Sequence, residues 1–219
     1  MLKINSKSKI ATKILVIGGS TYNPCTPCKI RDALVDSSFL EEWAVIFANH
    51  LYFYPNSQNN YHKISHEFYK IPYKTIDKIE KYSINKGYFY ILPEKTDFNI
   101  SYQNKQIDIQ VSKLNNGHKL CIDRVMRDIA SAHPRIQIAG LIICGRFKDG
   151  ADGLNQIQNN GGKTAVQNPD ECFHPDMAIF GNDTDSMPNE ALALNSSHKI
   201  VSLEIPPTKM TLTEWLCTL

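Results

Sequence analysis

Three residues of the kinds used together in acyl transfer each follow an uninterrupted apolar segment within a few positions. They are Ser20, His50 and Asp149. A serine hydroxyl becomes a good nucleophile when a base removes its proton, and an imidazole base needs a carboxylate to hold its tautomer and stabilise its charge. The three residues would therefore form a catalytic triad if the fold brings them together.

The elements that must position these residues are short apolar strands alternating with helices. The expected strands are residues 13–17, 43–47, 88–92, 137–144, 163–167 and 199–203, and the expected helices are residues 26–37, 61–69, 122–133 and 152–158. Uninterrupted apolar strands that alternate with helices predict a parallel sheet covered on both faces. Ligands bind beyond the carboxyl ends of the strands in such sheets. We therefore expect Ser20, His50 and Asp149 to lie at the same edge.

The middle of the chain has a different periodicity. Apolar and polar residues alternate over Phe98, Ile100 and Tyr102, and again over Ile107, Ile109 and Val111 after a polar turn near Asn104 and Lys105. Such alternation on both sides of a short turn predicts an antiparallel hairpin with one solvated face. The expected fold is a three-layer α/β/α arrangement with a mainly parallel, doubly wound sheet and this hairpin as an appendage. We see no internal repeat or flexible linker, so we expect residues 1–219 to form a single domain.

The local sequence around the serine also fits catalysis. Gly18 and Gly19 would let Ser20 sit on a tight turn between strand and helix. Free N–H groups at the start of the following helix would face a developing oxyanion. Each residue alone also fits a plainer role: Ser20 as a helix cap, His50 as a hydrogen-bonded buried histidine, and Asp149 as a turn residue. Their joint placement favours the catalytic interpretation.

The composition excludes several classes of protein. Of the 219 residues, 42% are hydrophobic and 21% are charged, which is typical of a folded globular protein. The net charge of +2 gives no strong attraction to nucleic acid or to an anionic membrane. No apolar run approaches the roughly 20 residues that span a bilayer, and the apolar run after the lysine-rich residues 1–13 is too short for a secretory signal. We therefore expect a cytoplasmic protein in which most of the six cysteines stay reduced.

Six segments, in order along the chain, resemble the catalytic domain of CheB-type protein-glutamate methylesterases. They are residues 17–21 (IGGST), Asn49-His50, and residues 87–93 (GYFYILP), 122–126 (IDRVM), 145–154 (GRFKDGADGL) and 161–167 (GGKTAVQ). The clearest match is residues 145–154, which is similar to the family pattern Gly-Met-Gly-x-Asp-Gly-Ala. The resemblance covers roughly residues 13–205.

This resemblance implies an α/β/α fold and hydrolysis of glutamate methyl esters on chemoreceptors, and some members of the family also deamidate receptor glutamines. Carried over residue by residue, it makes Ser20 the nucleophile, His50 the general base and acid, and Asp149 its orienting partner. Thr21 and Arg146 would support the oxyanion. The implied partners are the cytoplasmic domain of a methylated chemoreceptor and a separate response regulator. No cofactor, metal, nucleic acid or membrane insertion is implied.

The sequence departs from the family pattern at several positions. Tyr22 and Asn23 stand where the family usually has two glycines, which bears on how closely a substrate backbone can approach. Arg146 and Phe147 replace a methionine and a glycine, and phenylalanine would be strained there if that glycine has a positive φ. The family's Gly-Met-Pro segment is missing, with only Met177 near its place. We also expect no receiver domain ahead of the catalytic segment.

Three other interpretations stay open. Cys25 and Cys28 form a C-x-x-C pair at an expected helix start, the arrangement in which thioredoxin-like proteins favour a reactive thiolate. The same pair with Cys172 and His174 could bind zinc, although the spacing is irregular. A CheB-like protein without activity that binds a signalling partner is the third alternative, favoured by the departures from the family pattern.

Overall fold

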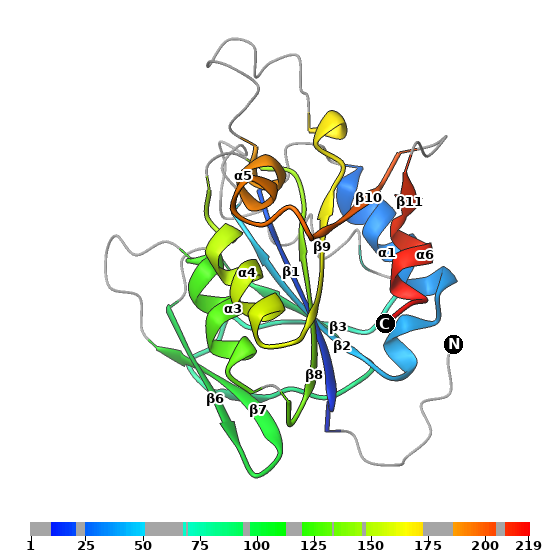
Figure 1. Ribbon diagram of the computed structural model, residues 1–219. Coiled ribbons are helices and arrows are strands. Elements are labelled where there is room, and N and C mark those ends of the chain that lie inside the picture. Colours follow the sequence, from blue (N-terminus) through cyan, green and yellow to red (C-terminus); the bar gives the residue numbers. More distant parts are fainter. Residues whose placement is uncertain are drawn as a thin grey trace, which may run out of the picture.

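A computed structural model of the chain describes residues 10–20, 25–50, 68, 70–93, 97–112, 120–132, 134–145, 148–172, 186–204 and 209–219. The strands of its main sheet are β1 (Lys13–Gly19), β2 (Ala44–Asn49), β3 (Tyr73–Thr75), β5 (Phe89–Leu92), β8 (Gln137–Ile142), β9 (Lys163–Gln167), β10 (Lys199–Ser202) and β11 (Met210–Thr211). These eight strands are ordered β11-β10-β9-β8-β1-β2-β5-β3, and each neighbouring pair is parallel (Figure 1). The strands that follow β1 in the sequence are therefore added to the sheet on both sides of β1.

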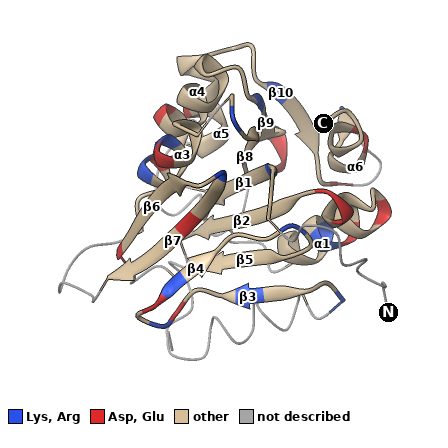
Figure 2. Cartoon of the chain, turned by 90° about the horizontal axis from the view of Figure 1, so that it is seen from below, with Lys and Arg blue, Asp and Glu red and all other residues tan. Residues whose placement is uncertain are grey.

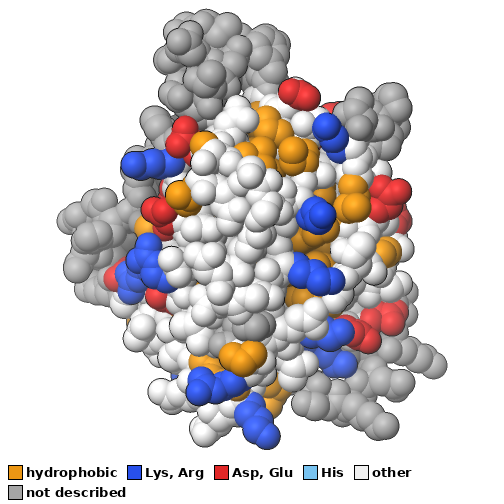
Figure 3. All heavy atoms as spheres, viewed as in Figure 1, with side chains coloured by type: hydrophobic (Ala, Val, Ile, Leu, Met, Phe, Trp, Pro, Cys, Tyr) orange, Lys and Arg blue, Asp and Glu red, His pale blue; other side chains and the backbone are white. Residues whose placement is uncertain are grey.

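Helices cover both faces of this sheet, as Figure 1 shows. On one face lie α3 (Ile122–Ala130), α4 (Ala151–Asn159) and α5 (Met187–Leu194), and on the other lie α1 (Thr26–Asp36), the short helix η1 (Phe39–Glu41) and α6 (Leu212–Leu216). A further short helix, η3 (Pro169–Glu171), follows β9. Figure 3 shows Lys and Arg side chains interspersed with Asp and Glu on the face of the molecule drawn in Figure 1.

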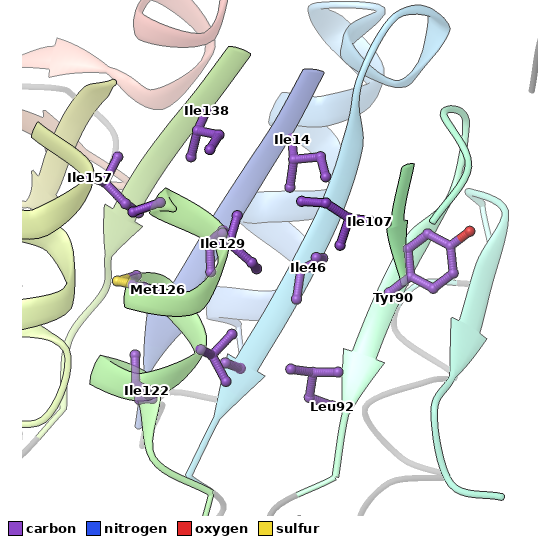
Figure 4. Close-up of a cluster of buried hydrophobic side chains, with 14 of the residues drawn as sticks. Ile14, Ile46, Tyr90, Leu92, Ile107, Ile122, Met126, Ile129, Ile138 and Ile157 are labelled. Carbon is purple, nitrogen blue, oxygen red and sulfur yellow. The ribbon is translucent and has the colours of Figure 1, made fainter. Parts of the chain in front are cut away.

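The core has two halves because strand side chains point alternately to opposite faces. In β1, Ile14 and Val16 join the cluster beneath α3 and α4, whereas Leu15 and Ile17 join the cluster beneath α1 and α6. Figure 4 shows the first cluster, where Ile122, Met126 and Ile129 of α3 meet side chains from the sheet. Burial on both faces explains why these strands are apolar throughout.

A separate antiparallel sheet consists of β4 (Lys81–Ser83), β7 (Gln106–Ser112) and β6 (Asp97–Gln103), in that order (Figure 2). Asn104 and Lys105 form the two-residue turn between β6 and β7, and both have positive φ, as tight hairpins require. Ile107 and Ile109 of β7 pack into the same core cluster as α3. The second sheet therefore extends the layer that contains α3.

The structure confirms the expected fold class, and several element boundaries shift. The strand expected at residues 13–17 continues through Gly18 and Gly19, and the helix expected at residues 122–133 ends at Ala130. The short strands β3, β4 and β11 and the helices α5 and α6 were not predicted. The helix expected at residues 61–69 falls almost entirely outside the described residues. The single-domain assignment stays a prediction. No helix in the described part of the chain has the length and apolar character needed to cross a bilayer.

Candidate active site

The carboxyl ends of β1, β2 and β8 lie side by side at one edge of the main sheet. Parallel pairing aligns Gly19 of β1 with Asn49 of β2, and Gly18 of β1 with Ile142 of β8. The chain proceeds from β1 to β2 on one side and later to β8 on the other. The edge above β1 is therefore a point where strand order reverses, which is the usual position of a ligand site in an open α/β sheet.

Backbone pairing continues just past the strands and fixes the first two candidate residues. The N–H of His50 donates to the carbonyl oxygen of Gly19 at 2.8 Å, and the N–H of Ser20 donates to that of Cys144 at 3.1 Å. Ser20 thus lies between the segments that follow β2 and β8. A Cβ on Gly19 would lie 2.1 Å from Cγ1 of Ile143, so the glycine permits this close approach.

Ser20 is buried, with 2% of its surface exposed. Its hydroxyl donates to the backbone carbonyl oxygen of His50 at 3.0 Å, so it contacts the backbone of this histidine. Gly145 leaves room for the serine, because a Cβ on Gly145 would lie 2.7 Å from the backbone nitrogen and 2.9 Å from the Cβ of Ser20. The first glycine of residues 145–154 therefore supports the position of the serine.

His50 and Asp149 form a direct side-chain pair. Nε2 of His50 lies 2.7 Å from Oδ2 of Asp149, and 9% of the imidazole and 26% of the carboxylate side chain are exposed. With the Nε2 proton directed to this carboxylate, Nδ1 is the ring nitrogen suited to accept a proton from a nucleophile. The structure thus brings Ser20, His50 and Asp149 to the same edge.

The Asp149 carboxylate is also bound by the first turn of α3. Its Oδ2 accepts the N–H of Ile122 at 2.9 Å, its Oδ1 accepts the N–H of Asp123 at 3.0 Å, and the thiol of Cys121 lies 3.7 Å from Oδ1. Burial would raise the pKa of Asp149, but the hydrogen bonds from His50 and from these two N–H groups outweigh it and lower the pKa. Asp149 is therefore held as an anion beside the imidazole.

Asp123 is a site residue that the sequence alone did not single out. It occurs within the IDRVM segment that resembles the family, and its placement in the first turn of an amphipathic helix is a common feature of helix N-termini. No local pattern indicates that its N–H donates to Asp149, because the two residues meet only through the fold.

Several residues of the sequence hypothesis lie outside the described residues. They are the supporting residues Thr21 and Arg146 and the positions that depart from the family pattern, Tyr22, Asn23, Phe147 and Met177. Their roles stay predictions.

The cysteines bear on the zinc interpretation. Cys144 and Cys172 form a disulfide across 28 positions of sequence, so Cys172 cannot act as a thiolate ligand in this state. His174 lies outside the described residues, and no group of three or more His, Cys, Asp or Glu suited to a metal occurs among the residues the structure describes. Cys25 and Cys28 are thiols rather than a disulfide. The proposed zinc set that includes Cys172 is therefore wrong for the structure described.

The parallel sheet and the polar cluster at its carboxyl edge define an open α/β domain with a candidate hydrolase site. Residues 15–209 match the family described as CheB methylesterase, and the chain belongs to this family. The matched range agrees closely with the resemblance found over residues 13–205.

Two named proteins are similar to this chain in sequence. The chain is 29% identical over 119 residues to protein-glutamate methylesterase/protein-glutamine glutaminase 2 of Cupriavidus pinatubonensis, a match covering 53% of this chain and 30% of that protein. It is 30% identical over 119 residues to protein-glutamate methylesterase/protein-glutamine glutaminase of Yersinia pestis, covering 53% of this chain and 31% of that protein. The matches thus span about a third of the length of these relatives.

The fold is similar to the crystal structure of the Thermotoga maritima CheB methylesterase catalytic domain. The TM-score is 0.62 at 17% sequence identity, and the match covers 87% of this chain and 92% of that chain. The likeness at this identity concerns the fold.

Proposed function

We propose that this protein hydrolyses the methyl esters of glutamate side chains through a Ser20-His50-Asp149 triad. The observation that carries the proposal is the 2.7 Å pairing of His50 Nε2 with Asp149 Oδ2 at the same sheet edge as the buried Ser20. This pairing supplies an oriented base, and membership of the CheB methylesterase family supplies the substrate class.

In the first step Nδ1 of His50 acts as the base. The Ser20 hydroxyl turns about its Cα–Cβ bond from the His50 carbonyl oxygen toward the ring, and its proton passes to Nδ1 as Oγ attacks the ester carbonyl carbon. The resulting oxyanion would be bound by the backbone N–H groups of Thr21 and Arg146. The imidazolium then gives its proton to the methoxy oxygen, methanol leaves, and an acyl-enzyme stays on Ser20.

In the second step water replaces methanol. His50 takes a proton from the water molecule, the hydroxide oxygen attacks the acyl carbon, and the proton returns to Ser20 Oγ as the glutamate carboxyl group is released. Asp149 stabilises the imidazolium in both steps because its lowered pKa keeps it charged. No cofactor takes part in this scheme.

The substrate would be the cytoplasmic domain of a methylated chemoreceptor, and a separate response regulator is the proposed regulatory partner. The named relatives in Cupriavidus and Yersinia combine methylesterase with glutaminase, which supports deamidation of receptor glutamines as a second reaction of the same site. An amide is attacked at the same carbonyl carbon, and the leaving group is then ammonia.

Methanol release from a methylated receptor domain tests the proposal. Ser20→Ala should abolish release and should also abolish labelling by a fluorophosphonate probe, whereas Ser131→Ala, which removes an exposed hydroxyl at the end of α3, should leave both unchanged. Release that persists in Ser20→Ala would exclude this serine as the nucleophile.

A second candidate is a CheB-like protein that binds a signalling partner without catalysis. The hydrogen bond from the Ser20 hydroxyl to a backbone carbonyl oxygen favours it, because the proton is directed away from the base. The same experiment separates the two candidates. If the protein is a non-catalytic binder, the wild-type protein should release no methanol and should not be labelled by the fluorophosphonate probe.

A further inference from the structure

The first turns of α3 and α4 lack side-chain caps of their own. Cys121 precedes α3 and Gly150 precedes α4, and neither provides a side-chain hydrogen bond to its helix. The first N–H groups of a helix have no partners within the helix and need acceptors from elsewhere. A carboxylate is a strong acceptor there because it also complements the helix dipole.

Each helix receives a carboxylate from the other. Asp149, just before α4, accepts the N–H groups of Ile122 at 2.9 Å and Asp123 at 3.0 Å in α3. Asp123 in turn accepts the N–H of Gly153 in α4 at 2.7 Å through its Oδ1, and it also interacts with the N–H of Gly150. The two aspartates thus exchange hydrogen bonds between the two helix starts.

The helices are in close contact at this exchange. A Cβ on Gly153 would lie 2.8 Å from the carbonyl oxygen and 2.9 Å from the Cα of Asp123, and 2.7 Å from the Cβ of Met126. The backbones therefore meet without an intervening side chain. A change in how Asp123 holds the first turn of α4 would be transmitted to Asp149, which lies only four residues before Gly153.

We propose that Asp123 is a positioning residue that fixes the Asp149 carboxylate against His50 by holding the start of α4 to the start of α3. Asp123 acts in this role through Asp149 and not on a substrate. The inference rests on the proposed function for its kinetic consequence, and its structural consequence is independent of any substrate.

The groups around Asp123 have opposing effects on its pKa. Burial raises the pKa of Asp123, the N–H groups of Gly153 and Gly150 lower it, and the nearby carboxylates of Asp149 and Asp152 raise it further. A negative charge on Asp123 is therefore costly beside the charged Asp149, and the hydrogen bonds that Asp123 accepts offset this cost. An amide oxygen could accept the same bonds without that charge.

The kinetic test compares three variants at Asp123. Asp123→Ala removes the acceptor and should lower kcat for methyl ester hydrolysis by about 10- to 100-fold with little change in KM, since a displacement of about 1 Å in an active site can cost about 100-fold. Asp123→Asn keeps an acceptor for the N–H of Gly153 and should stay within about threefold of wild type. Asp123→Glu keeps the charge but lengthens the side chain, so kcat should fall.

The structural test measures the proton shared by His50 and Asp149. Its ¹H NMR signal, assigned by its disappearance in Asp149→Asn, should shift or broaden in Asp123→Ala and Asp123→Glu and should persist in Asp123→Asn. The control Asp36→Asn removes an exposed carboxylate at the end of α1, on the other face of the sheet, and should leave both kcat and the signal unchanged.

The outcomes separate the two proposals. Wild-type kcat and an unchanged signal in Asp123→Ala would overturn the positioning role, and Asp123→Glu decides the same point if Asp123→Ala does not fold. A loss of thermal stability with an intact signal and kcat would also overturn it, because it would show a purely structural role. If the wild-type protein releases no methanol, the esterase proposal fails while the NMR signal still decides the positioning role.

Discussion

Nε2 of His50 lies 2.7 Å from Oδ2 of Asp149, although 99 positions separate the two residues in the chain. The same oxygen accepts the N–H of Ile122 at the start of α3. One carboxylate thus serves both the imidazole and a helix N-terminus. The field of the helix favours the carboxylate anion.

Asp149→Asn should therefore separate catalysis from folding. An asparagine retains an acceptor for α3 but lacks the charge that stabilises the imidazolium, so we expect a loss of about 10³- to 10⁴-fold in kcat. The loss of free energy of unfolding should be only about 1 kcal/mol, the typical contribution of a helix cap. Methanol release and urea unfolding measure the two effects.

Asp97→Asn removes an exposed carboxylate paired with Arg124 and should change neither kcat nor the free energy of unfolding by much. An Asp149→Asn variant with wild-type kcat would exclude the triad.

Gly145→Ala should disturb Ser20 directly. The new methyl group would lie 2.7 Å from the backbone nitrogen of Ser20 and 2.4 Å from Sδ of Met187. The methionine side chain can move, whereas the serine backbone is held in the sheet edge by Cys144. We expect the variant to lose at least about tenfold in kcat, an effect comparable to other small displacements in active sites.

The double variant Gly145→Ala/Met187→Ala identifies which contact matters. Removing the methionine relieves the contact with sulfur but leaves the contact with the Ser20 backbone. Activity should therefore stay low in the double variant. Recovery of activity would show that Met187, and not the serine, responds to the added methyl group.

The parallel sheet could be predicted because its strands are buried on both faces. A short, unbroken apolar run such as that of β8 is typical of a strand with no solvated face, and the hairpin has a clear period of two. The missed helices α5 and α6 are short, but their starts carry recognisable signals. The hydroxyl of Ser186 accepts the N–H of Asn189, and Thr211 and Glu214 form a capping box.

The site could be predicted only in part. Ser20, His50 and Asp149 follow strands, so strand order alone places them at the same edge. The direction of the Ser20 hydroxyl and the role of Asp123 depend on side-chain contacts between segments that are distant in sequence. The disulfide between Cys144 and Cys172 could not be predicted for the same reason, because six cysteines allow several pairings and only the fold selects one.

Reduction of that disulfide should lower stability. Closing a loop across 28 positions restricts the unfolded chain, and the expected contribution is roughly 3 to 4 kcal/mol. Chemical unfolding with and without dithiothreitol measures it, and Cys144→Ala/Cys172→Ala should match the reduced protein and no longer respond to the reductant. Cys217→Ala, which removes an exposed thiol, serves as the control. Equal unfolding midpoints with and without reductant would show that the bond contributes nothing.

His198 should make stability depend on pH in the range just below neutrality. Only 4% of its surface is exposed, and its Nδ1 lies 2.8 Å from the hydroxyl oxygen of Thr164. Burial lowers the pKa of His198 from its ordinary value near 6.5. As the pH falls below this value, the unfolded chain gains a proton that the folded protein does not yet accept. Its contribution to stability is therefore present above the unfolded pKa and is lost as the pH falls toward the folded pKa.

His198→Asn tests this dependence because asparagine can keep a hydrogen bond to Thr164 without titrating in this range. The free energy of unfolding of the wild-type protein should fall between pH 7 and pH 5, with a slope from this group of at most about 1.4 kcal/mol per pH unit. The variant should lose this part of the slope, so the difference in free energy of unfolding between the two proteins should change as the pH is lowered. Urea titrations at intervals of half a pH unit measure both curves. Parallel curves would show that His198 titrates alike in the folded and unfolded states.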